Sequence, residues 1–191
     1  MLQWNRGRRL VSYGGITFTY DAGGIRQSKT ANGVTHSYYT EGSTIHKETL
    51  SNGDALIYGY DESGIASIQY GCVMYYVQKN IQGDVVALVN ADGDVVAKYS
   101  YDAWGINYVY DAEGKMNASD SFIGNINPFR YRGYYYDRET GLYYLQTRNS
   151  DPTAGRFINA DSADYLDPES INGLNLYAYC GNNPVMNVDP S

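Results

Sequence analysis

The sequence is poor in several residues on which common classes of protein depend. It has only two cysteines, Cys72 and Cys180, and two histidines, His36 and His46, among 191 residues. Two distant cysteines either pair or remain as free buried thiols, so they do not fix the redox compartment. The histidines lie ten residues apart without a Cys or His partner at ligand spacing, so we expect no metal site and no cofactor.

Positive charge is also scarce, with 14 Lys and Arg against 21 Asp and Glu and a net charge of -7. We therefore expect no nucleic-acid partner, because neutralising phosphates requires a surplus of basic side chains.

No run approaches the roughly 20 apolar residues that a membrane helix needs. Arg6, Arg8 and Arg9 follow the first residues with no apolar stretch behind them, so no signal peptide is visible in the chain.

Tyrosine and glycine are abundant by contrast. The sequence has 22 Tyr against 4 Phe and 2 Trp, and 21 Gly against 5 Pro. Tyr favours half-buried pleated surfaces and Gly favours tight turns. With 43% hydrophobic residues the chain is not disordered on composition. Composition therefore predicts β-sheet with many hairpins, in one domain or two small ones.

Turn signals that contain glycine recur every 9 to 12 residues through most of the first two thirds of the chain. This spacing separates short strands and is typical of an all-β meander. Asn32-Gly33, Asn52-Gly53 and Asp92-Gly93 are two-residue hairpin signals, since both positions tolerate positive φ. Residues 84–89 and 94–101 flank the last of these signals and are rich in β-branched side chains, which predicts a hairpin.

A second period is superimposed on the first. Tyr20-Asp21, Tyr60-Asp61 and Tyr101-Asp102 are 40 and 41 residues apart, and each pair ends a predicted strand and enters a turn. The Asp side chain can accept backbone N–H bonds and close an Asx turn. We expect the Tyr ring to pack on the sheet with its hydroxyl in solvent. One such hairpin cannot bury a core alone, so neighbouring repeats must stack.

The sequence pattern changes after about residue 127. Turn signals no longer recur at a regular spacing, and short polar motifs follow one another closely. We predict a boundary there, with a repeat region over residues 1–126 and a C-terminal core over residues 127–191. The motifs of this core are NPFRYRGYYYD (127–137), ETGLYYL (139–145), Arg148, GRF (155–157), NLYAYCGNNP (175–184) and DPS (189–191).

These motifs resemble the RHS repeat-associated core domain, and the upstream Tyr-Asp repeats resemble RHS/YD repeats. The resemblance implies an antiparallel β-hairpin meander that forms part of a spiral β-sheet shell, closed by an irregular C-terminal plug. In that family a variable toxin follows the core, is held inside the shell, and is released by the core acting as an intramolecular aspartic protease. The resemblance thus implies a polymorphic toxin that is secreted or at the cell surface, with its own downstream toxin as partner.

The family's functional residues fall on Arg148, Asp161 and Asp189 of this chain. Two carboxylates in contact cannot both ionise cheaply, so they share a proton. The ionised member activates water as a base, and the protonated member polarises the scissile carbonyl. Arg148 either lowers one carboxyl pKa and orients the pair, or serves as a structural ion-pair partner or carbonyl clamp.

Nearby acidic residues have structural interpretations. Asp164 and Asp167 follow Asp161 closely and are interpreted as loop residues, and Asp151 as a turn residue.

The sequence also departs from the family pattern. Asn149 and Ser150 follow Arg148, where the family carries aromatic residues, and Ser162 stands where Pro is common. The terminal Asp-Pro-x-Gly motif lacks its Gly, because the chain ends at Ser191. We therefore expect a fragment without a scissile bond or a toxin, in which protease activity stays an open question.

A different class of function is also compatible with the residues. A Tyr-rich sheet with exposed rings is suited to stack on carbohydrate or to contact a partner protein, which would make this chain a non-enzymatic surface module. The structural alternative is that the Tyr rings pack across strands.

An exposed sheet edge near the N-terminus would pair with another chain, so we expect some self-association.

Overall fold

The computed structural model describes residues 2–5, 9–160 and 175–187. Its regular structure is almost entirely antiparallel strand, with one short α-helix, α1 (Ile123–Ile126), and the 3-10 turns η1 (Tyr131–Gly133) and η3 (Cys180–Asn182). The strands of the first sheet are β1 (Leu2–Asn5), β2 (Arg9–Tyr13), β3 (Ile16–Tyr20), β4 (Arg26–Ala31), β5 (Val34–Glu41), β6 (Thr44–Leu50), β7 (Ala55–Asp61), β8 (Gly64–Tyr70), β9 (Val73–Lys79), β10 (Val85–Val89), β11 (Val95–Tyr101) and β12 (Asn107–Asp111). The strands of the second sheet are β13 (Tyr135–Asp137), β14 (Leu142–Leu145), β15 (Arg148–Asp151) and β16 (Arg156–Phe157).

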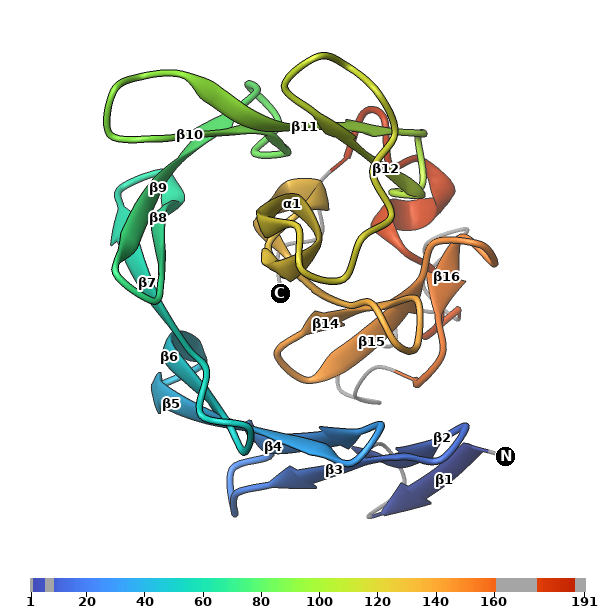
Figure 1. Ribbon diagram of the computed structural model, residues 1–191. Helices are drawn as coiled ribbons and strands as arrows, with labels where there is room; N and C mark the ends of the chain where they lie inside the picture. Colours follow the sequence, from blue (N-terminus) through green and yellow to red (C-terminus); the bar gives the residue numbers. More distant parts are fainter. Residues whose placement is uncertain (1, 6–8, 161–174, 188–191) are drawn as a thin grey trace.

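Each of the twelve strands of the first sheet pairs with the next one along the chain, so the sheet is a pure meander. Figure 1 shows this sheet curling into a C-shaped wall around α1 and the second sheet. We call the twelve-stranded sheet the wall, and residues 123–160 with 175–187 the plug. The meander and the enclosed C-terminal segment confirm the predicted fold class. The boundary at residue 127 stays a prediction.

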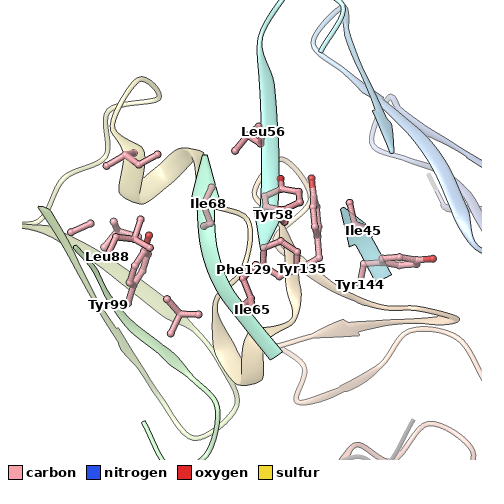
Figure 2. Close-up of a cluster of buried hydrophobic side chains, with 14 of the residues drawn as sticks. Ile45, Leu56, Tyr58, Ile65, Ile68, Leu88, Tyr99, Phe129, Tyr135 and Tyr144 are labelled. Atoms are coloured by element: carbon pink, nitrogen blue, oxygen red, sulfur yellow. The ribbon is translucent and has the colours of Figure 1, made fainter. Parts of the chain in front are cut away.

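The wall is a single layer, and its inner face is covered by the plug. Side chains alternate along β7, where Leu56 and Tyr58 are buried while Ile57 is 45% exposed on the outer face. Figure 2 shows the inner side chains of the wall beside Phe129 and Tyr135 of the plug. The rings of Tyr58 and Phe129 meet edge to face, with centroids 4.9 Å apart. The largest hydrophobic core therefore lies between wall and plug.

Only one of the three predicted two-residue hairpins has that form. Asn32-Gly33 joins β4 directly to β5, with positive φ at both residues (52° and 79°). Asp92-Gly93 lies in a longer loop, because the Asn90 N–H donates to the Asp94 carbonyl at 2.9 Å. The Asn90 side chain also accepts the N–H groups of Asp92 and Asp94, a cap that the dipeptide alone does not reveal. Asn52-Gly53 lies in a loop closed in the same way, at 2.8 Å.

The Tyr-Asp pairs occupy equivalent positions in three hairpins, and their tyrosines differ from the prediction. Their hydroxyls do not lie free in solvent but donate to backbone carbonyls of an earlier strand. The bonds are Tyr20 to Leu10 (2.7 Å), Tyr60 to Ile45 (2.7 Å) and Tyr101 to Val85 (2.6 Å). Burial raises the pKa of each of these phenols above its ordinary value. Each Tyr hydroxyl thus provides a hydrogen-bond donor for a backbone carbonyl of the preceding strand. The bond links the two neighbouring strands through a side chain.

The aspartates of two of these pairs, Asp61 and Asp102, close Asx turns as predicted, while Asp21 accepts the N–H of Ile25, four residues on, at 2.9 Å. The carboxylate of Asp102 accepts the N–H groups of Trp104 and Ile106 at 2.9 and 2.8 Å. Asp61 accepts the N–H of Ser63 at 2.8 Å. The repeat therefore encodes a self-contained turn in which one side chain caps the loop and the other bonds the preceding strand.

The two cysteines do not pair. Cys72 is exposed in the turn after β8, whereas Cys180 is buried in the plug, and no disulfide joins them. No helix in the described part of the chain has the length and apolarity needed to cross a membrane.

We predict that Tyr60→Phe destabilises the fold, because it leaves the Ile45 carbonyl without its donor. The expected loss in the free energy of unfolding is about 1–2 kcal/mol, measured by urea denaturation. Tyr76→Phe is the control, since Tyr76 is 48% exposed on the wall. Equal effects of the two substitutions would contradict a structural role for the Tyr60 hydroxyl.

Candidate functional site

Of the three predicted site residues, only Arg148 lies in the described part of the chain. Asp161 and Asp189 fall outside the described residues, as do Asp164 and Asp167. The proximity of the two predicted catalytic carboxylates therefore stays a prediction. Within the described residues, the candidate site comprises the surroundings of Arg148 and the contact between wall and plug.

Arg148 begins β15, which lies between β14 and β16 in the plug sheet. Arg148 and Ser150 are two residues apart and share a face of that sheet. Ser150 lies opposite Phe157, which brings the Phe157 ring to the same face. The guanidinium carbon of Arg148 lies 3.8 Å from the centroid of this fully buried ring. A desolvated cation–π contact of this kind is worth about 2 kcal/mol.

The turn that joins β15 to β16 is fixed to the wall. The Asp151 carboxylate accepts the N–H groups of Thr153 and Ala154 at 2.8 and 3.2 Å, which confirms its predicted turn role. Gly155 follows with φ 64°, and a Cβ at this position would approach the Trp104 indole to 3.0 Å. Trp104 belongs to the turn of the third Tyr-Asp pair. Close packing of Gly155 on Trp104 thus anchors the hairpin that carries Arg148.

The residues that depart from the family pattern beside Arg148 are buried. Asn149 is 4% exposed and Ser150 is 6% exposed. The backbone N–H of Asn149 donates to the side-chain oxygen of Asn159 at 2.8 Å, and the Asn159 amide donates to the Thr147 carbonyl at 3.1 Å. Asn159 therefore bonds the backbone on both sides of Arg148.

A buried cluster of charges joins the plug to the wall. Arg26 on β4 donates to the Asp137 carboxylate at 2.5 Å, and Lys29 on the same strand lies 3.2 Å from it. Lys29 also contacts Glu139 at 2.8 Å. Arg26, Lys29 and Asp137 are all at most 3% exposed. We call these four residues the charge clip.

The Arg26 guanidinium also lies among four aromatic rings. Its central carbon is 4.1 Å from the centroid of Tyr144, 5.0 Å from those of Tyr38 and Tyr135, and 5.5 Å from that of Phe18. Two of these rings come from the wall and two from the plug. The guanidinium is therefore fully enclosed only when the two parts are together.

Arg26, Lys29 and Asp137 of the charge clip stay ionised in spite of their burial. Burial raises the pKa of Asp137, but the positive charges of Arg26 and Lys29 outweigh it and hold that pKa below its usual value. Among the described residues, the Nε and Nη2 atoms of Arg26 have no hydrogen-bond acceptor. Desolvating charges is costly, so removing one partner leaves an uncompensated charge in the core.

A second polar network crosses the same interface. The Glu48 carboxylate on β6 accepts hydrogen bonds from Tyr58 of the wall and Tyr135 of the plug, at 2.7 and 2.9 Å, and contacts His36 Nδ1 at 2.5 Å. Burial raises the pKa of Glu48, but the hydrogen bond and charge of His36 and the other donors outweigh it, so the pKa lies below its usual value. Glu48 is thus a buried carboxylate held by both wall and plug.

A cavity of about 420 Å³ lies beside these two networks. Its lining includes Lys29, His36 and Glu48 from the wall and Tyr136 and Glu139 from the plug. The charged groups of Lys29, Glu48 and Glu139 already have the partners described above. Within the described residues, no three His, Cys, Asp or Glu side chains gather as a metal site would require.

The sequence analysis missed the charge clip and the Glu48 network. A usable signal was present for Lys29 and Glu48, which alternate with Ala31 and Leu50 on their strands. Arg26 lies three residues from Lys29 and faces inward with it only because of a register shift between β3 and β4, which the sequence does not show. An ionisable residue on the buried face of a strand requires a partner. The sequence does not say that the partners are Asp137 and Tyr135, over 85 residues away.

Comparison with known proteins identifies relatives along most of the chain. The sequence profile of the Teneurin YD-shell family matches residues 57–185. The tRNA nuclease WapA of Bacillus subtilis (strain 168) is 39% identical over 178 residues, which cover 91% of this chain and 7% of WapA. Toxin subunit YenC1 of Yersinia entomophaga is 29% identical over 91% of this chain and 19% of its own length.

A solved structure has the same fold. The crystal structure of TcdB2-TccC3-Cdc42 superposes with a TM-score of 0.72 at 21% identity, covering 99% of this chain and 10% of that one. The chain therefore spans only a small part of the relatives that it matches.

We predict that Asp137→Ala lowers the free energy of unfolding by about 3–5 kcal/mol, because it leaves Arg26 buried without its counter-ion and Lys29 with Glu139 alone. Guanidinium chloride denaturation measures this loss. Asp120→Ala is the matched control, since Asp120 forms an ion pair with Arg138 at 2.6 Å but its side chain is 92% exposed. That control should change stability far less. Similar losses in the two variants would contradict the importance of the clip.

Stability should also fall in acid. Asp137 and Glu48 have lowered pKa values in the folded protein, so their contribution is present above the unfolded-state pKa of about 4 and is lost as the pH falls through the folded values. We expect the free energy of unfolding to decline below about pH 4, and to decline less steeply in Glu48→Gln. An equally steep decline in that variant would exclude Glu48 as a source of the acid sensitivity.

Proposed function

Because this chain belongs to the Teneurin YD-shell family, we propose that it is the C-terminal wall and plug of an RHS-type polymorphic toxin. In the full-length protein the shell encloses a toxin that follows the plug in sequence, and the protein is secreted or displayed at the cell surface. The observation that carries the proposal is a curved YD-repeat wall whose inner face is covered by a plug with buried charged contacts. The names of WapA and of the double-stranded DNA deaminase toxin A of Burkholderia cenocepacia, 38% identical over 106 residues, support a toxin partner.

The second part of the proposal is release of the toxin by intramolecular aspartic-type proteolysis. Asp161 and Asp189 share a proton; one activates water and the other polarises the scissile carbonyl. Arg148 orients the pair and favours the ionised form of one carboxyl. Support comes from the position of Arg148, which is buried in the plug on a hairpin anchored to the wall.

A non-enzymatic surface module that binds carbohydrate or a partner protein is the alternative proposal. It is favoured by tyrosines that remain exposed on the wall, among them Tyr39 (58%), Tyr76 (48%) and Tyr108 (43%). Many other Tyr rings are used in the core, including Tyr38, Tyr58 and Tyr135. Self-association through β1, the first strand of the wall, belongs to the same alternative.

The proteolysis proposal is tested in the full-length protein with its native sequence beyond residue 191. We expect the wild type to cut itself during expression, and Asp161→Asn or Asp189→Asn to leave the precursor intact on a gel. Asp92→Asn, in an exposed turn of the wall, is the control and should be cut normally. Efficient cutting in both site variants would refute the catalytic assignment. An uncut wild type that binds glycans on an array would favour the surface-module alternative.

A further inference from the structure

We propose that Phe157 is a positioning residue that holds the guanidinium of Arg148 in the orientation needed for self-cleavage, an inference that rests on the proposed function. The two side chains lie on one face of the plug sheet, because Ser150 shares a face with Arg148 and pairs with Phe157. Their separation, 3.8 Å from guanidinium carbon to ring centroid, is the shortest of its kind among the described residues. The ring therefore supports the charged end of Arg148 directly.

Phe157 is itself immobilised. Its side chain is fully buried, and its ring meets the Tyr179 ring edge to face, with centroids 5.5 Å apart at 80°. Its backbone N–H donates to the Tyr177 carbonyl at 3.1 Å on the side away from β15. A buried ring that packs on Tyr179, on a backbone held by a hydrogen bond, presents a rigid flat surface to the guanidinium.

A fixed surface matters because an arginine has a long, flexible stem. Its planar guanidinium binds a carboxylate well only when its plane is correctly oriented, and stacking on an aromatic face provides that orientation. Functional groups must be held within about 0.5 Å of their productive positions by the residues behind them. In this chain the residue behind Arg148 is Phe157.

The charge of Arg148 gives the inference a distinctive readout. A nearby guanidinium lowers the pKa of a carboxyl that must be ionised to act as a base. If the guanidinium loses its support, that pKa rises and the reaction requires a higher pH. A residue that served only to stabilise the fold would change the amount of folded protein without shifting the pH dependence of the rate.

The experiment measures self-cleavage of the full-length protein, purified under conditions that preserve the precursor, as a first-order rate from pH 4 to 8. Phe157→Leu should slow cleavage by about tenfold to a hundredfold and move the acidic limb of the pH–rate profile to higher pH. Tyr39→Leu is the matched control, because it removes a ring that also lies over a cation, 5.6 Å from the Lys47 ammonium, but on the exposed face of the wall. Its rate and profile should match those of the wild type.

The outcomes separate this inference from the function on which it rests. An uncut wild type would overturn the proposed function. A wild type that cuts, beside a Phe157→Leu variant with an unchanged rate or an unshifted profile, would overturn only the positioning role. Phe157→Met fills the site without an aromatic ring and takes the place of Phe157→Leu if thermal melting shows that the latter is unfolded. The same slowing and the same shift are expected for it.

Discussion

The structure depends on covering the inner face of a sheet that is only one layer thick. Apart from its edge strands β1 and β12, a meander of twelve strands satisfies its own backbone hydrogen bonds, but it leaves one apolar face without a partner. The plug supplies that partner, and the largest core contains side chains from both parts. Arg26 and Glu48 add a stricter requirement, because a charge buried on the inner face must meet its counter-ion or its donors when the plug docks. Wall and plug therefore share one core.

The repeats show how a short motif builds the wall. Asp102 closes its own turn through two backbone N–H groups, and Tyr101 bonds a carbonyl of β10. The first interaction is local and the second ties one hairpin to the next. A chain that repeats both interactions every 40 or 41 residues links successive hairpins into one sheet. The turn that Asp102 closes also contains Trp104. Trp104 packs on Gly155 and so anchors the hairpin of Arg148.

Local patterns in the sequence predicted the local features of the fold. Glycine spacing indicated the meander, and Asp102 was correctly expected to cap a turn. The hydroxyl of Tyr60 was placed wrongly, because its acceptor is a carbonyl 15 residues away that no local pattern reveals. The pairing of Arg26 with Asp137 spans 111 residues and follows only from the curvature of the wall around the plug. Arg148 was found through family resemblance alone, and its contact with Phe157 required the register of the plug sheet.

The coupling of wall and plug through buried charge is the central claim, and a double-mutant cycle on Arg26 and Asp137 tests it most directly. Arg26→Met, Asp137→Leu and the double variant would be compared with the wild type by equilibrium denaturation. The account predicts a coupling energy of at least about 2 kcal/mol. Asp137→Leu leaves the buried Arg26 without a counter-ion, and Arg26→Met leaves Asp137 with Lys29 alone. The double variant removes both charges and leaves Lys29 paired with Glu139. Additive effects, within about 0.5 kcal/mol, would show that the two side chains do not depend on each other and would contradict the account.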